Sequence, residues 1–272
     1  MSASKYITVT APGFEDFRRT AESICRHGMP AGAEIIYDER NRLFRIRHNG
    51  QPYIVKAFRR PNPVNSVAYV TVRRSKAARS FANALRLTAL GIDTPRAAAY
   101  MEVRHGLHLA ESYYVCRDVA SPQIRHWERR PDMNAMLDAF ADDIVRLHLK
   151  GVWHKDFSPG NILVEGTQPP YRFHYIDLNR MRFGVRDRRR LMSMFGRMHD
   201  LREMVADLGH RYGLALERAR RAGSLPPSAP AFMHTMTPDA AAAEAAAAWD
   251  EFWGRMARKR RMKKILKTAS HK

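Results

Sequence analysis

The segment HKDFSPGNILV, residues 154–164, puts an acidic side chain and an amide into a loop ahead of an apolar strand. Asp156 precedes Asn161 by five residues, and Asn161 is followed directly by Ile, Leu and Val. Three branched apolar residues in a row predict a short buried strand. Asp156 and Asn161 therefore belong to a loop that turns back into that strand.

This arrangement matches the pattern H-x-D-x-x-x-x-N, in which the Asp and the Asn serve phosphoryl transfer. Transfer from ATP requires a protein to orient a hydroxyl, to hold magnesium ions (Mg2+) against the phosphates and to offset negative charge. An Asp in the loop can accept the proton of the hydroxyl, and the Asn can reach a metal ion. We therefore predict Asp156 as the catalytic base and Asn161 as a metal ligand, with His154 as a packing residue.

A second carboxylate follows another predicted strand. In YRFHYIDLNR, residues 171–180, Asp177 ends an apolar strand 16 residues after Asn161. This is where a further metal-binding Asp of such a site is expected. The alternative is that Asp156, Asn161 and Asp177 only cap loops and strand ends. Their common register favours the magnesium site.

A strand lysine lies upstream. The stretch YIVKAF places Lys56 inside a predicted strand, a hundred residues before Asp156. An ammonium group there would neutralise charge on the α- and β-phosphates of ATP. The alternative is an ordinary lysine of an edge strand.

The first part of the chain reads as a small sheet. Residues 33–59 alternate apolar and polar side chains, which predicts a three-stranded antiparallel meander with Lys56 in its third strand. One amphipathic helix is predicted over residues 73–90. Two more strands are predicted around residues 95–103 and 109–119.

The remainder reads as helical. Helices are predicted over residues 131–151, 187–212, 214–222 and 238–267, with a proline-rich break before the last. We therefore expect an α+β chain of two lobes. The predicted divisions are a lobe of antiparallel sheet with one helix over 1–120, a helical lobe over 121–237, and a C-terminal helix with a polybasic tail over 238–272.

Composition points to anionic partners. Lys and Arg number 47 against 27 Asp and Glu, a net charge of +20, which favours phosphates, an anionic membrane surface or nucleic acid. The two cysteines, Cys25 and Cys116, suggest neither a disulfide framework nor a zinc site. No signal peptide or apolar run of membrane-spanning length is present, so we expect a cytoplasmic protein.

Three stretches together resemble one known family. VKAFRRPNPVNSVAYVTVRR with the helix after it, HKDFSPGNIL, and IDLNRMRFG are similar to the lipopolysaccharide kinases, the Kdo and inner-core heptose kinases. The likeness covers about residues 30–215. It implies a protein-kinase-like fold and ATP-dependent phosphorylation of a sugar hydroxyl in the lipid A-linked core, at the cytoplasmic face of the inner membrane. By position it implies that Lys56 holds phosphates, Asp156 is the base, and Asn161 and Asp177 bind magnesium.

Two departures from the kinase pattern concern the ATP site. Between Arg40 and Ile92 there are twelve Lys or Arg and no Asp or Glu, so the predicted helix has no glutamate to pair with Lys56. Either Ser80 or Asn83 orients the lysine, or a carboxylate comes from elsewhere, or catalysis is impaired. The segment YDERNR also lacks glycines to cover the phosphates, so Arg40 or Arg42 is expected to bind them instead.

A third departure concerns the acceptor. Only LNRMRFGVR separates Asp177 from the next predicted helix, which leaves no room for the long activation loop on which protein substrates dock. Within that segment we expect Arg180 and Arg182 to meet an anionic acceptor, such as a carboxylated or phosphorylated sugar. A solvated basic face is the alternative for both.

The C-terminal helix has an aromatic and a basic part. Trp249, Phe252, Trp253 and Met256 form one stripe, which we expect to pack on the helical lobe. From Arg255 to the end there are nine Lys or Arg and no acid. This end suits an anionic membrane surface; the alternative is a soluble basic tail.

The sequence thus predicts an ATP- and magnesium-dependent kinase whose acceptor is an anionic glycolipid of the lipopolysaccharide core. The rivals are another small-molecule phosphotransferase or a protein kinase of the same fold, and a non-catalytic kinase-like binding module. Nucleic acid is the least favoured partner, because no motif of a DNA-reading fold is visible.

Overall fold

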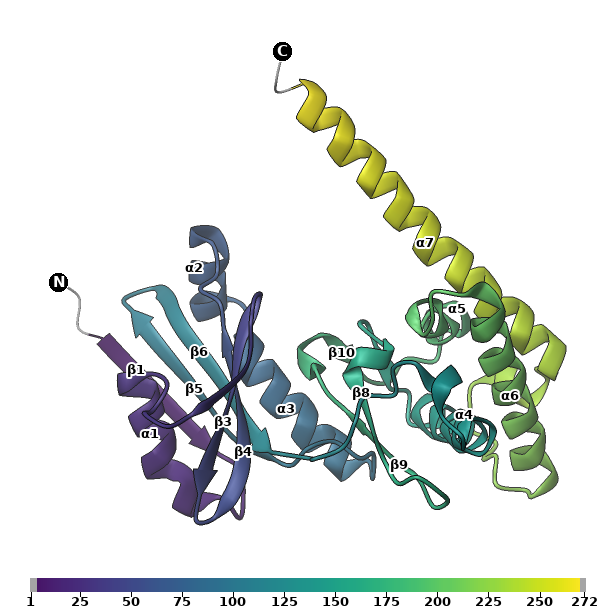
Figure 1. The fold of residues 1–272 in the computed structure, drawn as a ribbon, viewed down its shortest axis with the longest axis horizontal. Coiled ribbons are helices and arrows are strands. Elements are labelled where there is room, and N and C mark those ends of the chain that lie inside the picture. The colour runs from purple at the N-terminus through teal and green to yellow at the C-terminus, as the bar shows by residue number, and fades with distance from the viewer. Residues whose placement is uncertain (1–3, 270–272) are drawn as a thin grey trace. The chain divides into compact units, whose positions relative to one another are not determined.

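The computed structural model describes the backbone of residues 4–269 and the side chains of residues 4–263 (Figure 1). The chain forms two compact units. The first comprises the chain up to Ser121 together with His174–Arg180, and the second comprises Pro122–Phe173 together with the chain from Met181 onward. Each unit is described by itself.

A six-stranded antiparallel sheet forms the core of the first unit, with the strand order β1-β5-β6-β4-β3-β2. The strands are β1 (Ser4–Thr10), β2 (Glu34–Asp38), β3 (Asn41–His48), β4 (Gln51–Phe58), β5 (Ala97–His105) and β6 (His108–Arg117). The predicted meander is confirmed as β2, β3 and β4. Its second turn has Asn49 at φ 49° and Gly50 at φ 72°, the left-handed pair that joins twisted strands in a tight hairpin.

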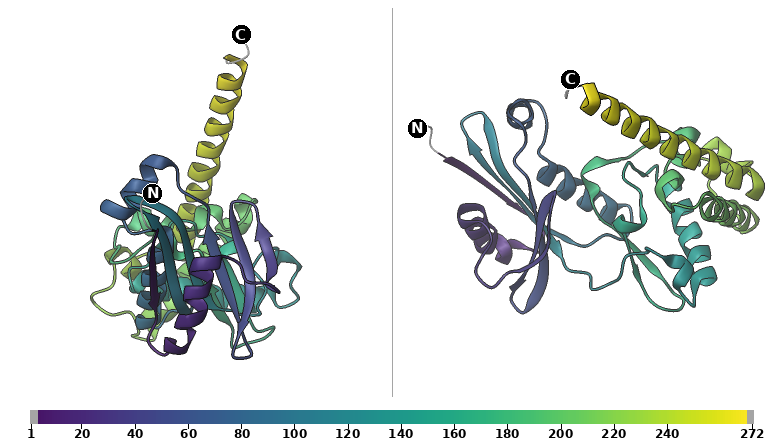
Figure 2. Two further views of the ribbon diagram at one scale, coloured as in Figure 1. Left: turned by 90° about the vertical axis from the view of Figure 1, so that its left-hand side faces the viewer. Right: turned by 45° about the horizontal axis from the view of Figure 1, so that its top comes forward.

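Three helices accompany this sheet: α1 (Arg18–His27), α2 (Pro63–Thr71) and α3 (Lys76–Ala89). The predicted helix is α3, while β1, α1 and α2 were not predicted. Side chains cap two of the helices, since Asn62 accepts a hydrogen bond from the Asn65 amide and Ser75 accepts one from the Ala78 amide. Helix α1 packs on β1 and β5, and α3 packs on β5 and β6 (Figures 1 and 2).

The second unit is mainly helical. Its helices are α4 (Met133–Leu149), α5 (Arg188–Met192), α6 (Arg202–Arg221) and α7 (Pro238–Ala269). Strand β7 (Trp153–His154) pairs with β10 (Met181–Arg182), and β8 (Ile162–Glu165) pairs with β9 (Arg172–Tyr175), of which only the first two residues belong to this unit. No helix among residues 4–269 is both long and apolar enough to cross a bilayer.

The predicted helix boundaries in this unit are partly wrong. The structure has one continuous helix, α6, where a break was expected near Gly213, and the segment before Arg202 holds only the short α5 and a 3-10 turn. Gly213 does not end a helix, because it is a contact point with α7: a Cβ atom there would overlap Pro238. Gly209, one turn earlier, is similar, since its Cβ would lie 2.5 Å from the Cβ of Ala245.

Small residues on α7 face these glycines. Ala241, Ala245 and Ala246 are buried, so the alanine-rich stretch of α7 lets two helix backbones approach closely, in addition to favouring helix. The aromatic stripe that follows is half-buried, and the Trp249 indole donates to the carbonyl of His199 at 3.2 Å. The stripe therefore packs on the second unit, as predicted.

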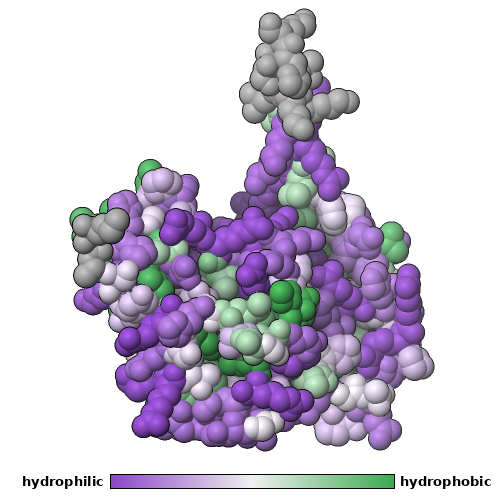
Figure 3. Space-filling model, turned by 60° about the vertical axis from the view of Figure 1, so that its left-hand side comes forward, coloured by the Kyte–Doolittle hydropathy of each residue, from purple (hydrophilic) through white to green (hydrophobic). Residues whose placement is uncertain are grey.

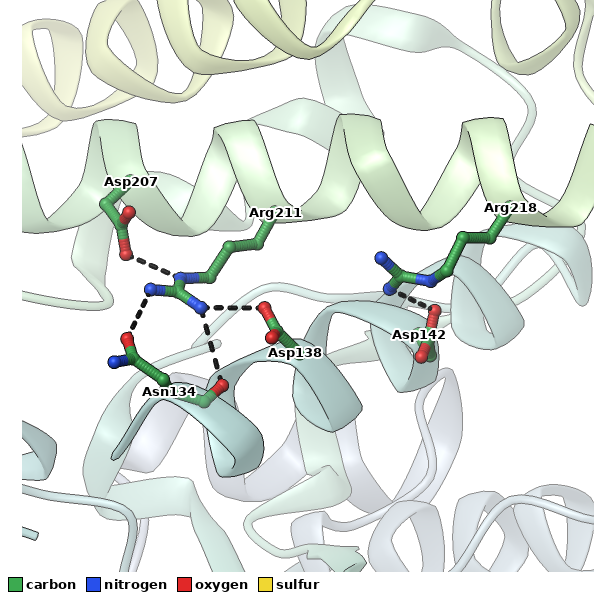
Figure 4. Close-up of polar contacts among 6 residues, drawn as sticks. All are labelled: Asn134, Asp138, Asp142, Asp207, Arg211 and Arg218. Carbon is green, nitrogen blue, oxygen red and sulfur yellow. Dashed lines mark hydrogen bonds and ion pairs between the residues drawn. The ribbon is translucent and has the colours of Figure 1, made fainter. Parts of the chain in front are cut away.

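Polar side chains join α4 to α6 (Figure 4). The Arg211 guanidinium donates to Asp207, to Asp138 and to Asn134, each at 2.7 Å. Desolvation lowers the pKa of Arg211, but these carboxylates outweigh it and the pKa lies above its ordinary value. Two turns further along α6, Arg218 donates to Asp142 at 2.8 Å.

Candidate active site

Lys56 lies in the middle of the sheet in the first unit. It sits on β4, opposite Leu43 of β3 and Tyr114 of β6, so two neighbouring strands fix its backbone. Its ammonium group donates to the Oδ1 atom of Asp177 at 2.7 Å, and the lysine side chain is only 16% exposed. Two predicted site residues that are 121 positions apart are thus in direct contact.

The backbone of Asp177 is in an unusual conformation. Its φ of 56° lies in the left-handed region, which few residues other than glycine adopt, although Asp and Asn tolerate it best. The Asn179 amide donates to the same Oδ1 atom at 2.7 Å. Asp177 therefore presents one carboxylate oxygen to two donors, and its side chain remains 31% exposed.

Contacts on either side hold the Asp177 segment against the first unit. The Tyr175 amide donates to the carbonyl of Asp93 at 3.1 Å, and the Thr94 hydroxyl donates to the carbonyl of Tyr175 at 2.7 Å. After the carboxylate, the Asn83 amide of α3 donates to the carbonyl of Leu178 at 2.7 Å. The helix therefore positions the carboxylate, although it lacks a glutamate.

The partner of the strand lysine is now identified. Ser80 donates to the Lys76 carbonyl of its own helix, and Asn83 donates to the Leu178 carbonyl. These hydrogen bonds go to partners other than the Lys56 ammonium. Of the three alternatives, the carboxylate from elsewhere is the one observed, and that carboxylate is Asp177.

The Asp156 loop lies in the second unit and is braced from within. His154 is buried and its Nδ1 atom accepts the Asp156 amide at 3.1 Å. The side-chain amide of Asn161 donates to the Asp156 carbonyl at 2.7 Å. The loop is therefore closed across the five residues that separate Asp156 from Asn161, while the Asp156 side chain is 19% exposed.

A basic residue that was not predicted pairs with Asp156. The Arg197 guanidinium, from the 3-10 turn η5 (Phe195–Arg197), donates to Asp156 Oδ1 at 2.8 Å. It also lies over the Phe252 ring, with 5.2 Å to the ring centroid. Nothing in the local sequence marks Arg197, because it is 41 residues from Asp156 and one of many arginines.

The remaining predicted site residues are distributed over the two units. Arg40 lies in the exposed turn between β2 and β3. Arg42 forms an exposed ion pair with Asp38 at 2.8 Å. Arg180 belongs to the first unit and Arg182 to the second. Arg182 lies opposite Trp153 where β10 pairs with β7.

The side chains expected to bind magnesium fit that ion chemically. Carboxylate and amide oxygens are hard donors, and magnesium bound with ATP takes one or two protein carboxylates and fills its other positions with phosphates and water. Within the described part of the chain, no three His, Cys, Asp or Glu side chains gather into a metal site. Asp177 and Asn161 each carry an oxygen of this kind.

The sequence pattern of the lipopolysaccharide kinase (Kdo/WaaP) family matches residues 63–211, and no curated protein matches. The solved structure of WaaP in complex with acyl carrier protein is similar at 18% identity and a TM-score of 0.53, over 80% of this chain and 94% of that one.

Two other matching solved structures have TM-scores below 0.5. A Rio2 kinase from Chaetomium thermophilum has 17% identity and a TM-score of 0.45, over 89% of this chain and 77% of that one. An aminoglycoside-3'-phosphotransferase of type VIII has 14% identity and a TM-score of 0.48, over 88% of this chain and 100% of that one. The similarity to WaaP places the fold among the kinase-like folds, as predicted.

Proposed function

Since the chain belongs to the lipopolysaccharide kinase (Kdo/WaaP) family, we propose that it transfers the γ-phosphate of ATP to a sugar hydroxyl of the lipopolysaccharide inner core, on Kdo or a neighbouring heptose. Membership makes the chain a phosphotransferase that acts on a hydroxyl group. The rival of a non-catalytic module is accordingly disfavoured.

One observation carries the proposal: the 2.7 Å contact between the Lys56 ammonium and the Asp177 carboxylate. The contact joins a lysine in the middle of the sheet to a carboxylate whose backbone lies in the left-handed region. For ATP binding the pair makes sense, because the ammonium can bind phosphate oxygens and the carboxylate can bind the metal that accompanies them.

In this proposal each residue has one task. Asp156 accepts the proton of the acceptor hydroxyl, Lys56 binds the α- and β-phosphates, and Asp177 and Asn161 hold magnesium. Arg40 and Arg42 bind phosphates from the turn that has no glycine. Magnesium, when bound, neutralises charge that develops on the transferred phosphoryl group.

The hydrogen bonds of the Asp156 loop support its assignment as the base. His154 and Asn161 hold the backbone of Asp156 from both sides, so the carboxylate has a defined position. The Arg197 guanidinium contacts the same carboxylate at 2.8 Å and further restricts its position.

The test is phosphate incorporation from radiolabelled ATP into a panel of core saccharides, Kdo-lipid A among them. Asp156→Asn should lower the rate about a thousandfold because the proton acceptor is lost, yet keep the ATP-and-magnesium shift in melting temperature. Asp177→Asn should lose both the rate and that shift. The proposal fails if the wild type phosphorylates no member of the panel, or if Asp156→Asn retains the rate.

We further propose that α7 rests on an anionic membrane surface, such as the cytoplasmic face of the inner membrane. In Figure 3 the coloured part of α7 next to the grey atoms is mostly hydrophilic, and Met262 is 57% exposed among basic neighbours. Each cation near an anionic surface contributes about 1 kcal/mol.

Co-sedimentation checks this placement. The full chain should sediment with vesicles of phosphatidylcholine and phosphatidylglycerol, and not with phosphatidylcholine alone. Replacing Arg258, Arg260 and Arg261 by Ala should release it, since three cations would be lost. Equal binding of the variant and the wild type would contradict the placement.

A further inference from the structure

A cavity of about 600 Å³ lies in the second unit beside Asp156. Its walls come from the Asp156 loop, from α5 and η5, and from the middle of α7. Asp156 is therefore the point at which the expected catalytic loop meets a space large enough for a sugar residue.

The charges that line the cavity are unbalanced. Six cationic side chains line it against three acidic ones; the cations are Lys155, Arg189, Arg190, Arg197, Arg255 and Lys259. Each acid is already engaged: Asp156 with Arg197 at 2.8 Å, Glu251 with Arg255 at 2.6 Å, and Asp187 with the Arg190 amide at 2.8 Å.

Two lysines remain without a counter-charge. Among the side chains that the structure describes, no carboxylate forms an ion pair with Lys155 or Lys259. Lys155 directly precedes Asp156 in the chain, and Lys259 is one turn beyond Arg255 on α7. Both are exposed and line the same cavity, so its electrostatics favour an anionic ligand.

Aromatic rings orient two of the arginines. The Arg190 guanidinium lies 5.5 Å from the centroid of Trp153, and that of Arg197 lies 5.2 Å from the centroid of Phe252. A guanidinium stacked on a ring is held in place before a ligand arrives. Trp153 and Phe252 also offer apolar surface to the C–H face of a sugar ring.

We propose that this cavity is the acceptor site and that Lys155 and Lys259 bind an oxyanion, carboxylate or phosphate, carried by the acceptor saccharide near the hydroxyl presented to Asp156. Helix α7 thereby forms a wall of the site and selects anionic acceptors over neutral ones. The inference rests on the proposed phosphotransfer and adds the residues that recognise the acceptor.

The test is steady-state kinetics with a soluble, deacylated core saccharide, which removes any contribution from membranes. Lys155→Ala and Lys259→Ala should each raise the KM for this saccharide about tenfold, the effect of losing one charge-assisted contact. The KM for ATP should stay unchanged. Lys150→Ala is the matched control: it is an exposed lysine of the same unit that does not line the cavity, and it should change neither constant.

Modified saccharides identify the oxyanion. If the lysines bind a carboxylate, the tenfold difference should vanish with the carboxyl-reduced saccharide; if they bind a phosphate, it should vanish with the dephosphorylated one. The inference is overturned if the difference in KM between the variants and the wild type remains after both groups are removed. It is also overturned if neither variant changes the KM. Both outcomes leave the phosphotransfer intact. If the wild type phosphorylates no saccharide at all, the proposed function itself is wrong.

Discussion

At the scale of single residues, the main finding is that Asp177 takes the place of a helix glutamate as the partner of Lys56. In the kinase pattern the lysine pairs with a glutamate of the helix, and the metal-binding Asp is a separate group. Here one carboxylate serves the lysine directly, and α3 contributes through Asn83, which holds the backbone at Leu178. The absence of acids between Arg40 and Ile92 therefore does not leave the lysine unpaired.

Replacing Lys56 by Met tests this pairing. We expect the rate of phosphotransfer to fall at least a hundredfold, because a preorganised positive charge at the phosphates is removed. The melting temperature without ATP should change little, since a partly exposed ion pair contributes little to stability. Initial rates and a thermal melt check both points; a Lys56→Met variant with near wild-type rate would contradict the assignment.

At the scale of elements, the contact between α6 and α7 depends on glycines inside a helix. Glycine normally weakens a helix interior relative to alanine by about 1 kcal/mol. At Gly209 we expect the opposite: alanine should be less stable than glycine, because its Cβ atom would lie 2.5 Å from that of Ala245. Two helices that meet at small residues cannot accept even one methyl group without moving apart.

Gly209→Ala should therefore lower the free energy of unfolding by about 1–3 kcal/mol. Gly254→Ala is the matched control, since its Cβ would meet nothing closer than an arginine nitrogen at 3.8 Å; it should leave stability unchanged or raise it by up to about 1 kcal/mol. Urea unfolding of both variants provides the comparison. Stabilisation by Gly209→Ala would show that the helices do not meet there.

At the scale of the whole molecule, a buried histidine links stability to pH. His148 lies fully buried in the second unit, and its Nδ1 atom is 2.8 Å from the Tyr212 hydroxyl. Burial lowers the pKa of His148 from 6.5 to about 3. Between these two values the unfolded chain binds a proton that the folded chain does not, so stability falls as the pH falls below 6.5.

The expected cost at pH 5 is about 2 kcal/mol relative to pH 7.5, which follows from the 1.36 kcal/mol of each pKa unit. Urea unfolding at both pH values measures it. The Phe ring of His148→Phe does not titrate. The difference in unfolding free energy between pH 5 and pH 7.5 should therefore shrink by about that amount in this variant, even if it is less stable at both. An unchanged difference would mean that His148 is not buried in the neutral form.

The sequence by itself determined the elements around the motifs. Alternating side chains specified the meander that carries Lys56, and the loop of Asp156 and Asn161 followed from local turn and strand signals, because both depend on neighbours in the chain. Strand β1 at the edge of the sheet and the short helices α1 and α2 were not predicted.

Only the tertiary structure decided which distant side chains meet. Lys56 and Asp177 are separated by 121 positions, and Arg197 and Asp156 by 41; no local periodicity relates such pairs. Local sequence could not predict the role of Gly213 either, since a glycine that ends a helix and one that lets a neighbouring helix approach look alike in the sequence. The physical reason is that charge pairing and close packing depend on positions in space, which folding brings together from remote parts of the chain.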